Sequence, residues 1–221
     1  MRSPRRHLPL FLLLTITLGV AGCSSWSVWP GAGSTAAPQR VSGLLERGED
    51  HWTLRACGQE HERPLQPTAE LERLFDEVGQ PGQLSIFTEL EVIERAGDWV
   101  VSQTHRGEST GRGCQNTRGA NSQWVGFSLA DSWRVDITTQ GMQLSTEDTE
   151  DGRQLSVISE QLPDGAIGFR GAHDQGLELW LYPTGCIERS TGDYYHLSAT
   201  LVRDGQRLNG GGYQGGSQAP R

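Results

Sequence analysis

Three cysteines in the body of the chain, Cys57, Cys114 and Cys186, carry the most reactive side chains of the sequence. In an oxidising compartment, three thiols form at most one intramolecular disulfide and leave one thiol over. Cys114 follows a glycine-rich stretch that can reach either of the other two, so Cys57–Cys114 and Cys114–Cys186 both stand as pairings. Such a bridge would stabilise the fold by about 2–4 kcal/mol.

A catalytic cysteine is the competing interpretation of these residues. A cysteine nucleophile needs a histidine placed by the fold and a lowered thiol pKa. His51, His61 and His105 lie near Cys57 or Cys114 in the sequence, but no family signature surrounds any cysteine. We therefore expect structural cysteines and predict no catalytic residue, and a hydrolase that uses Cys or Ser chemistry is the alternative.

The sequence predicts no metal site and no cofactor. Its histidines are scattered, without the His-x-x-x-His or Cys-x-x-Cys spacing that holds zinc, so we expect them at the surface. The acidic segment 147–152 lacks the spaced ligands of a calcium loop and is expected to be a solvated hairpin tip.

The first 22 residues predict a secretory signal peptide. They combine an arginine-rich start with the apolar run 8–20, which is too short to span a bilayer comfortably. Val20-Ala21-Gly22-Cys23 then resembles the lipobox of bacterial lipoproteins. That resemblance implies cleavage before Cys23, a diacylglyceryl group on its sulfur and a fatty acyl chain, such as palmitate, on the new amine.

Residues 23–40 are rich in Ser, Gly, Ala and Pro and predict a lipidated flexible tether. Ser24 and Ser25 follow the cysteine where an inner-membrane lipoprotein often carries Asp, which favours the outer membrane and a periplasm-facing domain. The chain has 19 basic residues, three of them in the signal, against 27 acidic ones. This balance argues against nucleic acid as a partner.

The remaining sequence predicts a mainly β fold in two small antiparallel barrel or sandwich modules. Residues 41–104 form the N-terminal module and contain one helix near residues 68–78. Thr68 can cap that helix, and apolar residues follow at helical spacing. A polar, glycine-rich loop is expected over residues 105–122.

The C-terminal module is expected over residues 123–212, followed by a disordered tail at 213–221. Short alternating runs separated by turns, several of them Asp-Gly, are typical of antiparallel hairpins. The predicted strands are 123–128, 132–138, 141–145, 154–159, 165–170, 176–182, 194–202 and 207–208. Trp124, Trp133 and Trp180 are expected in the core, the alternative being that they line a barrel mouth for a sugar or lipid ligand.

Two stretches resemble a group of uncharacterised bacterial envelope lipoproteins. One is Trp52-Thr-Leu-Arg-Ala-Cys57-Gly; the other runs from Cys186 through Ser190-Thr-Gly-Asp-Tyr-Tyr195 to Gly205-Gln-Arg-Leu-Asn-Gly210. The group includes small β-rich modules of META and NlpE-like type. The resemblance implies a β-rich envelope lipoprotein and supplies no catalytic residue. The family pattern often ends Gly-Cys-Gly, and residues 210–212 here lack that cysteine, which is the usual partner of Cys186.

Together these patterns predict a non-enzymatic lipoprotein of the outer membrane that binds a small molecule or an envelope protein. The lipid on Cys23 is expected to anchor the protein to the membrane. Besides the hydrolase, inhibition of a cationic lysozyme is an alternative, because an acidic surface suits such a partner.

Overall fold

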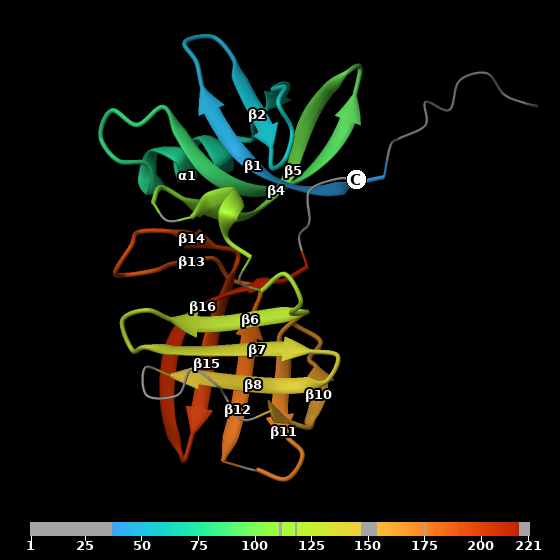
Figure 1. The fold of residues 1–221 in the computed structure, drawn as a ribbon, viewed down its shortest axis with the longest axis vertical. Helices are drawn as coiled ribbons and strands as arrows, with labels where there is room; N and C mark the ends of the chain where they lie inside the picture. The colour runs from blue at the N-terminus through green and yellow to red at the C-terminus, as the bar shows by residue number, and fades with distance from the viewer. Residues whose placement is uncertain (1–36, 111, 118, 147–153, 175, 217–221) are drawn as a thin grey trace, which may run out of the picture. The chain divides into compact units, whose positions relative to one another are not determined.

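The computed structural model describes residues 37–110, 112–117, 119–146, 154–174 and 176–216. The predicted signal peptide, the lipidation site Cys23 and the acidic segment 147–152 lie outside these residues. The fold is mainly β, with 56% strand and 8% helix, which confirms the predicted class. The strands form one sheet of seven and one of nine (Figure 1).

Five strands of the first sheet close into a barrel, which we call the first barrel. They are β1 (Gln39–Arg47), β2 (Trp52–Ala56), β3 (Arg63–Gln66), β4 (Ser85–Arg95) and β5 (Asp98–Glu108). They pair in the order β1-β2-β3-β5-β4, and β4 returns to β1; only β3 and β5 are parallel. With the one α-helix between β3 and β4, this is the topology of the OB fold.

The helix α1 (Ala69–Val78) forms where the sequence predicts it. The Thr68 side chain accepts a hydrogen bond from the Leu71 N–H at 3.1 Å, and Gly79 follows the last helical residue. The apolar positions of the helix are buried against the first barrel: Leu71, Leu74, Phe75 and Val78. Local capping and apolar periodicity therefore agree with the tertiary packing.

The nine-stranded sheet is antiparallel and nearly closed, and we call it the second barrel. Its strands are β6 (Trp124–Ser128), β7 (Trp133–Thr138), β8 (Gly141–Thr146), β9 (Gln154–Leu155), β10 (Val157–Gln161), β11 (Ile167–Gly171), β12 (Leu177–Tyr182), β15 (Leu197–Arg203) and β16 (Gln206–Gln214). β16 pairs with β6, while β9 and β10 are the two edges. The predicted Asp204-Gly205 turn joins β15 to β16, with positive φ at both residues.

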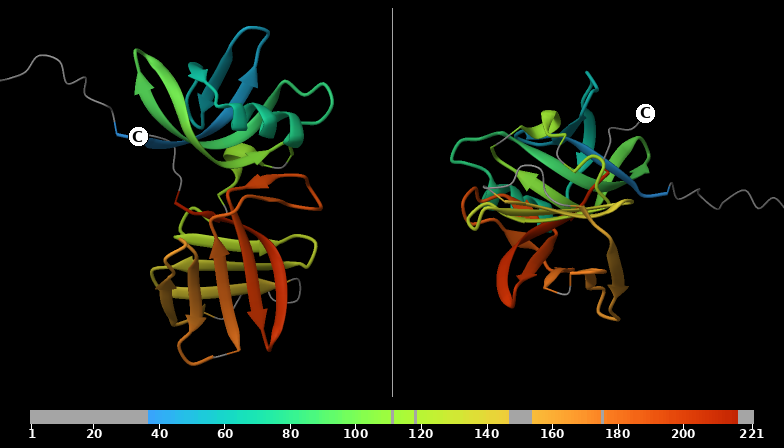
Figure 2. Two further views of the ribbon diagram at one scale, coloured as in Figure 1. Left: turned by 180° about the vertical axis from the view of Figure 1, so that it is seen from behind. Right: turned by 60° about the horizontal axis from the view of Figure 1, so that its bottom comes forward.

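A small hairpin connects the two sheets. It consists of β13 (Cys186–Ile187) and β14 (Tyr194–Tyr195), which lie between β12 and β15 in the sequence. β14 nevertheless pairs with β5 of the first sheet, Tyr195 opposite Arg106 and Tyr194 opposite Gly107. In Figure 1 and in the left view of Figure 2, the orange hairpin lies beside the green end of β5.

Three predicted boundaries are wrong by a few residues, because strands continue past them. The loop expected from residue 105 starts after Glu108, because β14 and β4 hold the end of β5 in a ladder. The tail expected from residue 213 starts later, because Tyr213 and Gln214 pair with β6. The tether expected to end at residue 40 gives way to β1 at Gln39, which pairs with β4.

Two predicted strands are divided by a single residue. The run 154–159 breaks at Ser156 into β9 and β10, the opposite edges of the second barrel. The run 194–202 breaks at His196, where the chain passes from the first sheet to the second. A local pattern of strand residues does not reveal which sheet each residue joins.

Candidate binding cleft

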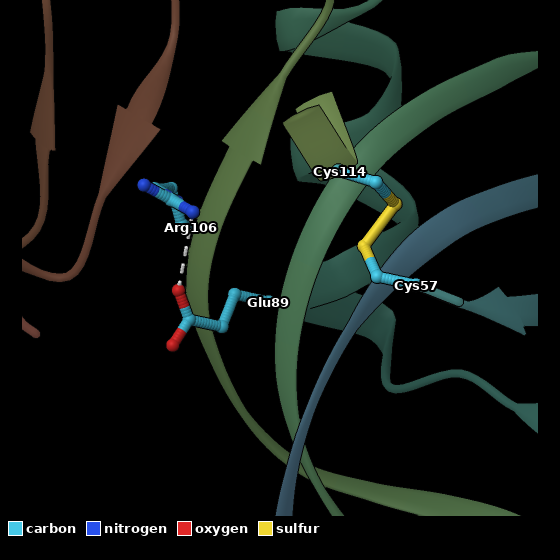
Figure 3. Close-up of a disulfide and its surroundings, with 4 residues drawn as sticks. All are labelled: Cys57, Glu89, Arg106 and Cys114. Carbon is cyan, nitrogen blue, oxygen red and sulfur yellow. Dashed lines mark ion pairs between the residues drawn. A yellow bond between two sulfur atoms is a disulfide. The ribbon is translucent and has the colours of Figure 1, made fainter. Parts of the chain in front are cut away.

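The cysteines form the first of the two predicted pairings. Cys57, after β2, is bonded to Cys114 in the short 3₁₀ turn η1 (Gly113–Gln115), with a Cα–Cα distance of 5.3 Å (Figure 3). The bridge ties the connector between the barrels to the first barrel.

Cys186 is a free thiol that lines a cavity of about 440 Å³. Burial raises its pKa, and the nearby Glu188 carboxylate raises it further, against the opposing effect of Arg189. No histidine lines this cavity. The surroundings therefore disfavour the thiolate that a cysteine nucleophile requires.

The sequence also contains Gly107-Glu108-Ser109-Thr110-Gly111, which matches the Gly-x-Ser-x-Gly pattern of a serine hydrolase. In such enzymes the serine sits between a strand and a helix. Here Ser109 follows β5, its N–H donates to Asp193 at 3.1 Å, and the next described element is the three-residue η1. Its surroundings in a cavity of about 320 Å³ include no histidine. The motif lacks the context that would make the serine a nucleophile.

The three tryptophans lie in the second barrel. Trp133 is buried in its core, and Trp124 packs against that core. Trp180 is half-buried, and its indole N–H donates to Glu178 at 2.9 Å. None of them lines the cavities described in this section.

Charged side chains are buried near the end of β5, where the sequence predicts a solvated loop. Glu89 on β4 has no exposed surface, and Arg40 on β1 forms an ion pair with it. Arg106 lies between two carboxylates: its Nη2 is 3.5 Å from Glu89 Oε2, as Figure 3 shows for that pair, and its Nε is 3.5 Å from Glu108 Oε1. We call Arg40, Glu89, Arg106 and Glu108 the charge cluster.

Aromatic rings cover the charge cluster. The Arg106 guanidinium lies 4.9 Å from the Phe87 ring centroid and 4.8 Å from that of Tyr213, within the range of cation–π attraction. Tyr213 belongs with Phe127 and Tyr195 to a buried group of rings, the aromatic triad, in which Phe127 and Tyr195 meet edge to face at 4.7 Å. Tyr195 also donates a hydrogen bond to Glu108 at 3.3 Å.

Burial shifts the titration of the acids beside these rings. The pKa of Glu108 is raised by loss of water, with smaller increases from Asp193 and Glu89 opposing the decreases from Arg106 and the Tyr195 hydrogen bond. Burial likewise raises the pKa of Asp193 and of Tyr195. Groups with shifted pKa values gathered at a cavity identify a candidate functional site.

Two cavities meet at this point, and both are lined by Arg106, Asn116 and Tyr213. The larger, about 390 Å³, also contacts Ser42 and the disulfide. The smaller, about 260 Å³, is lined by the three groups whose pKa values are raised, together with other polar residues: Glu108, Asp193, Tyr195, Thr110, Arg112, Arg134 and Thr191. We call the two cavities together the arginine cleft.

A pair of histidines lies near the charge cluster. The rings of His105 and His196 meet edge to face at 4.5 Å, and the His196 backbone N–H donates to the His105 carbonyl at 2.9 Å. Burial lowers the pKa of His105 to about 3 and that of His196 to about 4; the neighbouring His196 also lowers the former, and Arg40 lowers both. Both rings are neutral near pH 7, and their expected surface location is wrong.

We also looked for side chains that could bind a metal ion in the described part of the chain. Among the residues that the structure describes, no three histidine, cysteine, aspartate or glutamate side chains are placed to hold a metal ion together. The lining of the arginine cleft combines hydrogen-bonding groups, charged groups and aromatic rings.

Comparison with known proteins adds no relative: no family model, curated protein or solved structure matches the chain significantly. Across the described part of the chain, no helix has the length and apolar character needed to cross a membrane.

Proposed function

We propose that the protein is a lipoprotein of the outer membrane, anchored by a lipid on Cys23, that binds a ligand in the periplasm without chemical turnover. The ligand site is the arginine cleft. The sequence supports the anchor through its lipobox, and the fold supports a binding role through the residues gathered at the cleft.

The observation that carries the proposal is the position of Arg106, a buried arginine shared by two cavities. A largely formed concave site with a few convergent polar groups is typical of a small-molecule site. Neither Cys186 nor Ser109 has a histidine in the cavity that it lines, which favours binding over hydrolysis.

Native mass spectrometry of the full chain, purified from envelopes in a detergent without a sugar headgroup, tests the proposal. We expect a retained small-molecule mass in the wild type that is lost or reduced in Glu108→Gln, because Glu108 lines the smaller cavity. Glu160→Gln is the matched control, since Glu160 forms an exposed ion pair with Arg170.

A bare polypeptide mass, together with cross-linking to an envelope protein, would replace the small-molecule proposal with a protein–protein function. The denatured mass of the same sample reports the anchor independently, because lipidation adds acyl mass at Cys23. An unmodified cysteine would overturn the lipoprotein part alone.

A further inference from the structure

We propose that the smaller cavity of the arginine cleft binds a neutral saccharide, one hexopyranose ring at a time. This inference rests on the proposed binding function and names its ligand class. Four features of the cavity carry it: balanced charge, an aromatic wall, underused hydrogen-bonding groups and size.

The charges around the cavity are balanced. Arg106, Arg112 and Arg134 line it, and Glu108 and Asp193 line it as well. Arg134 forms a bidentate pair with Asp136 at 2.6 and 2.8 Å, outside the lining, and Arg106 shares Glu89 with Arg40. An anionic ligand would meet the carboxylates, and a cationic ligand would meet the arginines. A neutral ligand that both donates and accepts hydrogen bonds avoids both penalties.

The walls of the cavity divide by chemistry. The aromatic triad of Phe127, Tyr195 and Tyr213 provides a buried apolar wall. Thr110 and Thr191 add hydroxyl groups, and Asn116 adds an amide. A pyranose ring has a matching division, with C–H groups on its faces and hydroxyl groups at its edge.

Two buried groups retain hydrogen-bonding capacity. Arg106 is 5% exposed, its Nε–H makes no hydrogen bond to any described group, and its ion pairs are 3.5 Å long. Charge-assisted hydrogen bonds are normally about 2.7–2.9 Å long, so a ligand oxygen can compete for these donors. The raised pKa of Glu108 allows its carboxyl group to accept from a hydroxyl or, when protonated, to donate to one.

The volume of the smaller cavity limits the number of sugar rings that it can hold. The cavity volume of about 260 Å³ lies below the range of roughly 300–1,000 Å³ that drug-sized ligands occupy. It therefore suits a single sugar ring, and any further sugar of a longer glycan would extend outward past the exposed Thr110 and Arg112.

The test is titration calorimetry of the full chain, in a detergent without a sugar headgroup, with glucose, galactose, mannose and N-acetylglucosamine. At least one of these sugars should bind saturably, with a dissociation constant in the micromolar to millimolar range. Glu108→Gln should weaken that binding by about tenfold or more, because a hydrogen bond to a charged group is lost. Glu160→Gln should leave the affinity unchanged.

Folding of the variant is not expected to confound this result. Glutamine keeps the shape of the Glu108 side chain and an oxygen that can accept the hydrogen bond from Tyr195, so only the charge of the carboxylate is removed. Thr110→Val provides a second variant at an exposed position and should weaken binding about threefold or more, since one hydroxyl contact is removed.

Absence of saturable binding by all four sugars, or an affinity that Glu108→Gln leaves unchanged, would overturn the saccharide assignment. Glycine and alanine are titrated in parallel, because a zwitterion also suits a site of mixed charge. Binding of either amino acid in place of the sugars would overturn the saccharide class and leave the proposed binding function standing. A bare native mass with a cross-linked protein partner would overturn both.

Discussion

The two barrels bury their strands differently. In the second barrel, β7 and β12 alternate strictly between buried and half-buried residues, as expected when one face of a strand meets the core. In the first barrel, the last five residues of β5, 104–108, are all buried. β14 pairs with this end of β5, and the Phe87 and Tyr213 rings pack against Arg106. A strand covered on both sides can hold charges that a one-sided strand leaves in solvent.

Two ion pairs, one from each barrel, illustrate the extremes of burial. On the second barrel, Arg170 and Glu160 form an ion pair at 2.7 Å with 47% and 37% of their side chains exposed. In the first, the Glu89 side chain has no exposure and faces two arginines. An exposed pair contributes little to stability, whereas removal of one partner from a buried pair leaves an uncompensated charge.

The largest expected effect comes from breaking the buried pairs. Glu89→Ala leaves Arg40 without its carboxylate partner and should lower the free energy of unfolding by about 3–5 kcal/mol. Glu160→Ala removes one side of the exposed pair and should change it by at most about 1 kcal/mol. Urea unfolding followed by tryptophan fluorescence measures both. If both variants lost the same free energy of unfolding, burial of the charge cluster would make no difference to stability.

Next in size is the disulfide, which belongs to the first barrel and its connector. The double variant Cys57→Ala/Cys114→Ala should lose about 2–4 kcal/mol, because the bridge joins residues 57 apart in sequence and restricts the unfolded chain. Cys186→Ala, which alters a half-buried free thiol, should cost about 1 kcal/mol or less. Urea unfolding with and without reductant provides the check. A wild type whose stability is insensitive to reductant would contradict the prediction.

The smallest effect expected from a single residue concerns pH. Because the pKa of His105 and of His196 is lower in the folded protein than the ordinary 6.5, the unfolded chain binds more protons. Above pH 6.5 these two histidines do not lower the free energy of unfolding. As the pH falls toward 4 they do lower it, by about 1–2 kcal/mol per histidine at pH 5. Raised pKa values at Glu108 and Asp193 act in the opposite sense, adding stability as those acids protonate.

His105→Phe isolates the histidine contribution, because it removes one titrating ring while keeping an aromatic ring against His196. Its stability should fall less between pH 7 and pH 5 than that of the wild type. His51→Phe alters an exposed histidine and should retain the wild-type dependence. Parallel pH curves for the wild type and His105→Phe would contradict the assigned cause.

The features readable from the sequence are those that depend on neighbouring residues. The helix was predictable because Thr68 caps it and its apolar residues recur at helical spacing. The strands of the second barrel were predictable because apolar and polar residues alternate in them, as in Trp133–Thr138.

The site was not predictable in the same way. Thr104-His-Arg-Gly-Glu108 is polar throughout, and its burial depends on Tyr195 and Tyr213, which are far away in the sequence. The pairing of Cys57 with Cys114 likewise depended on where the connector runs. A possible signal was the pattern Tyr194-Tyr195, two aromatic residues in a short polar hairpin, although its partner strand could not be read from it.

Arg40 also contacts the far end of the chain: its guanidinium donates to the backbone carbonyl groups of Gln214 and Gly215. A chain made from its N-terminus completes β1 to β5 early, while the partners of Arg40 and of the Arg106 strand are still to come. The first barrel can therefore close early, but the end of β5 lacks β14, and Arg40 lacks its contacts with Gln214 and Gly215, until those residues have been synthesised. A chain that ends before β16 would therefore lack the carbonyl groups that Arg40 contacts, although it holds every strand of the first barrel.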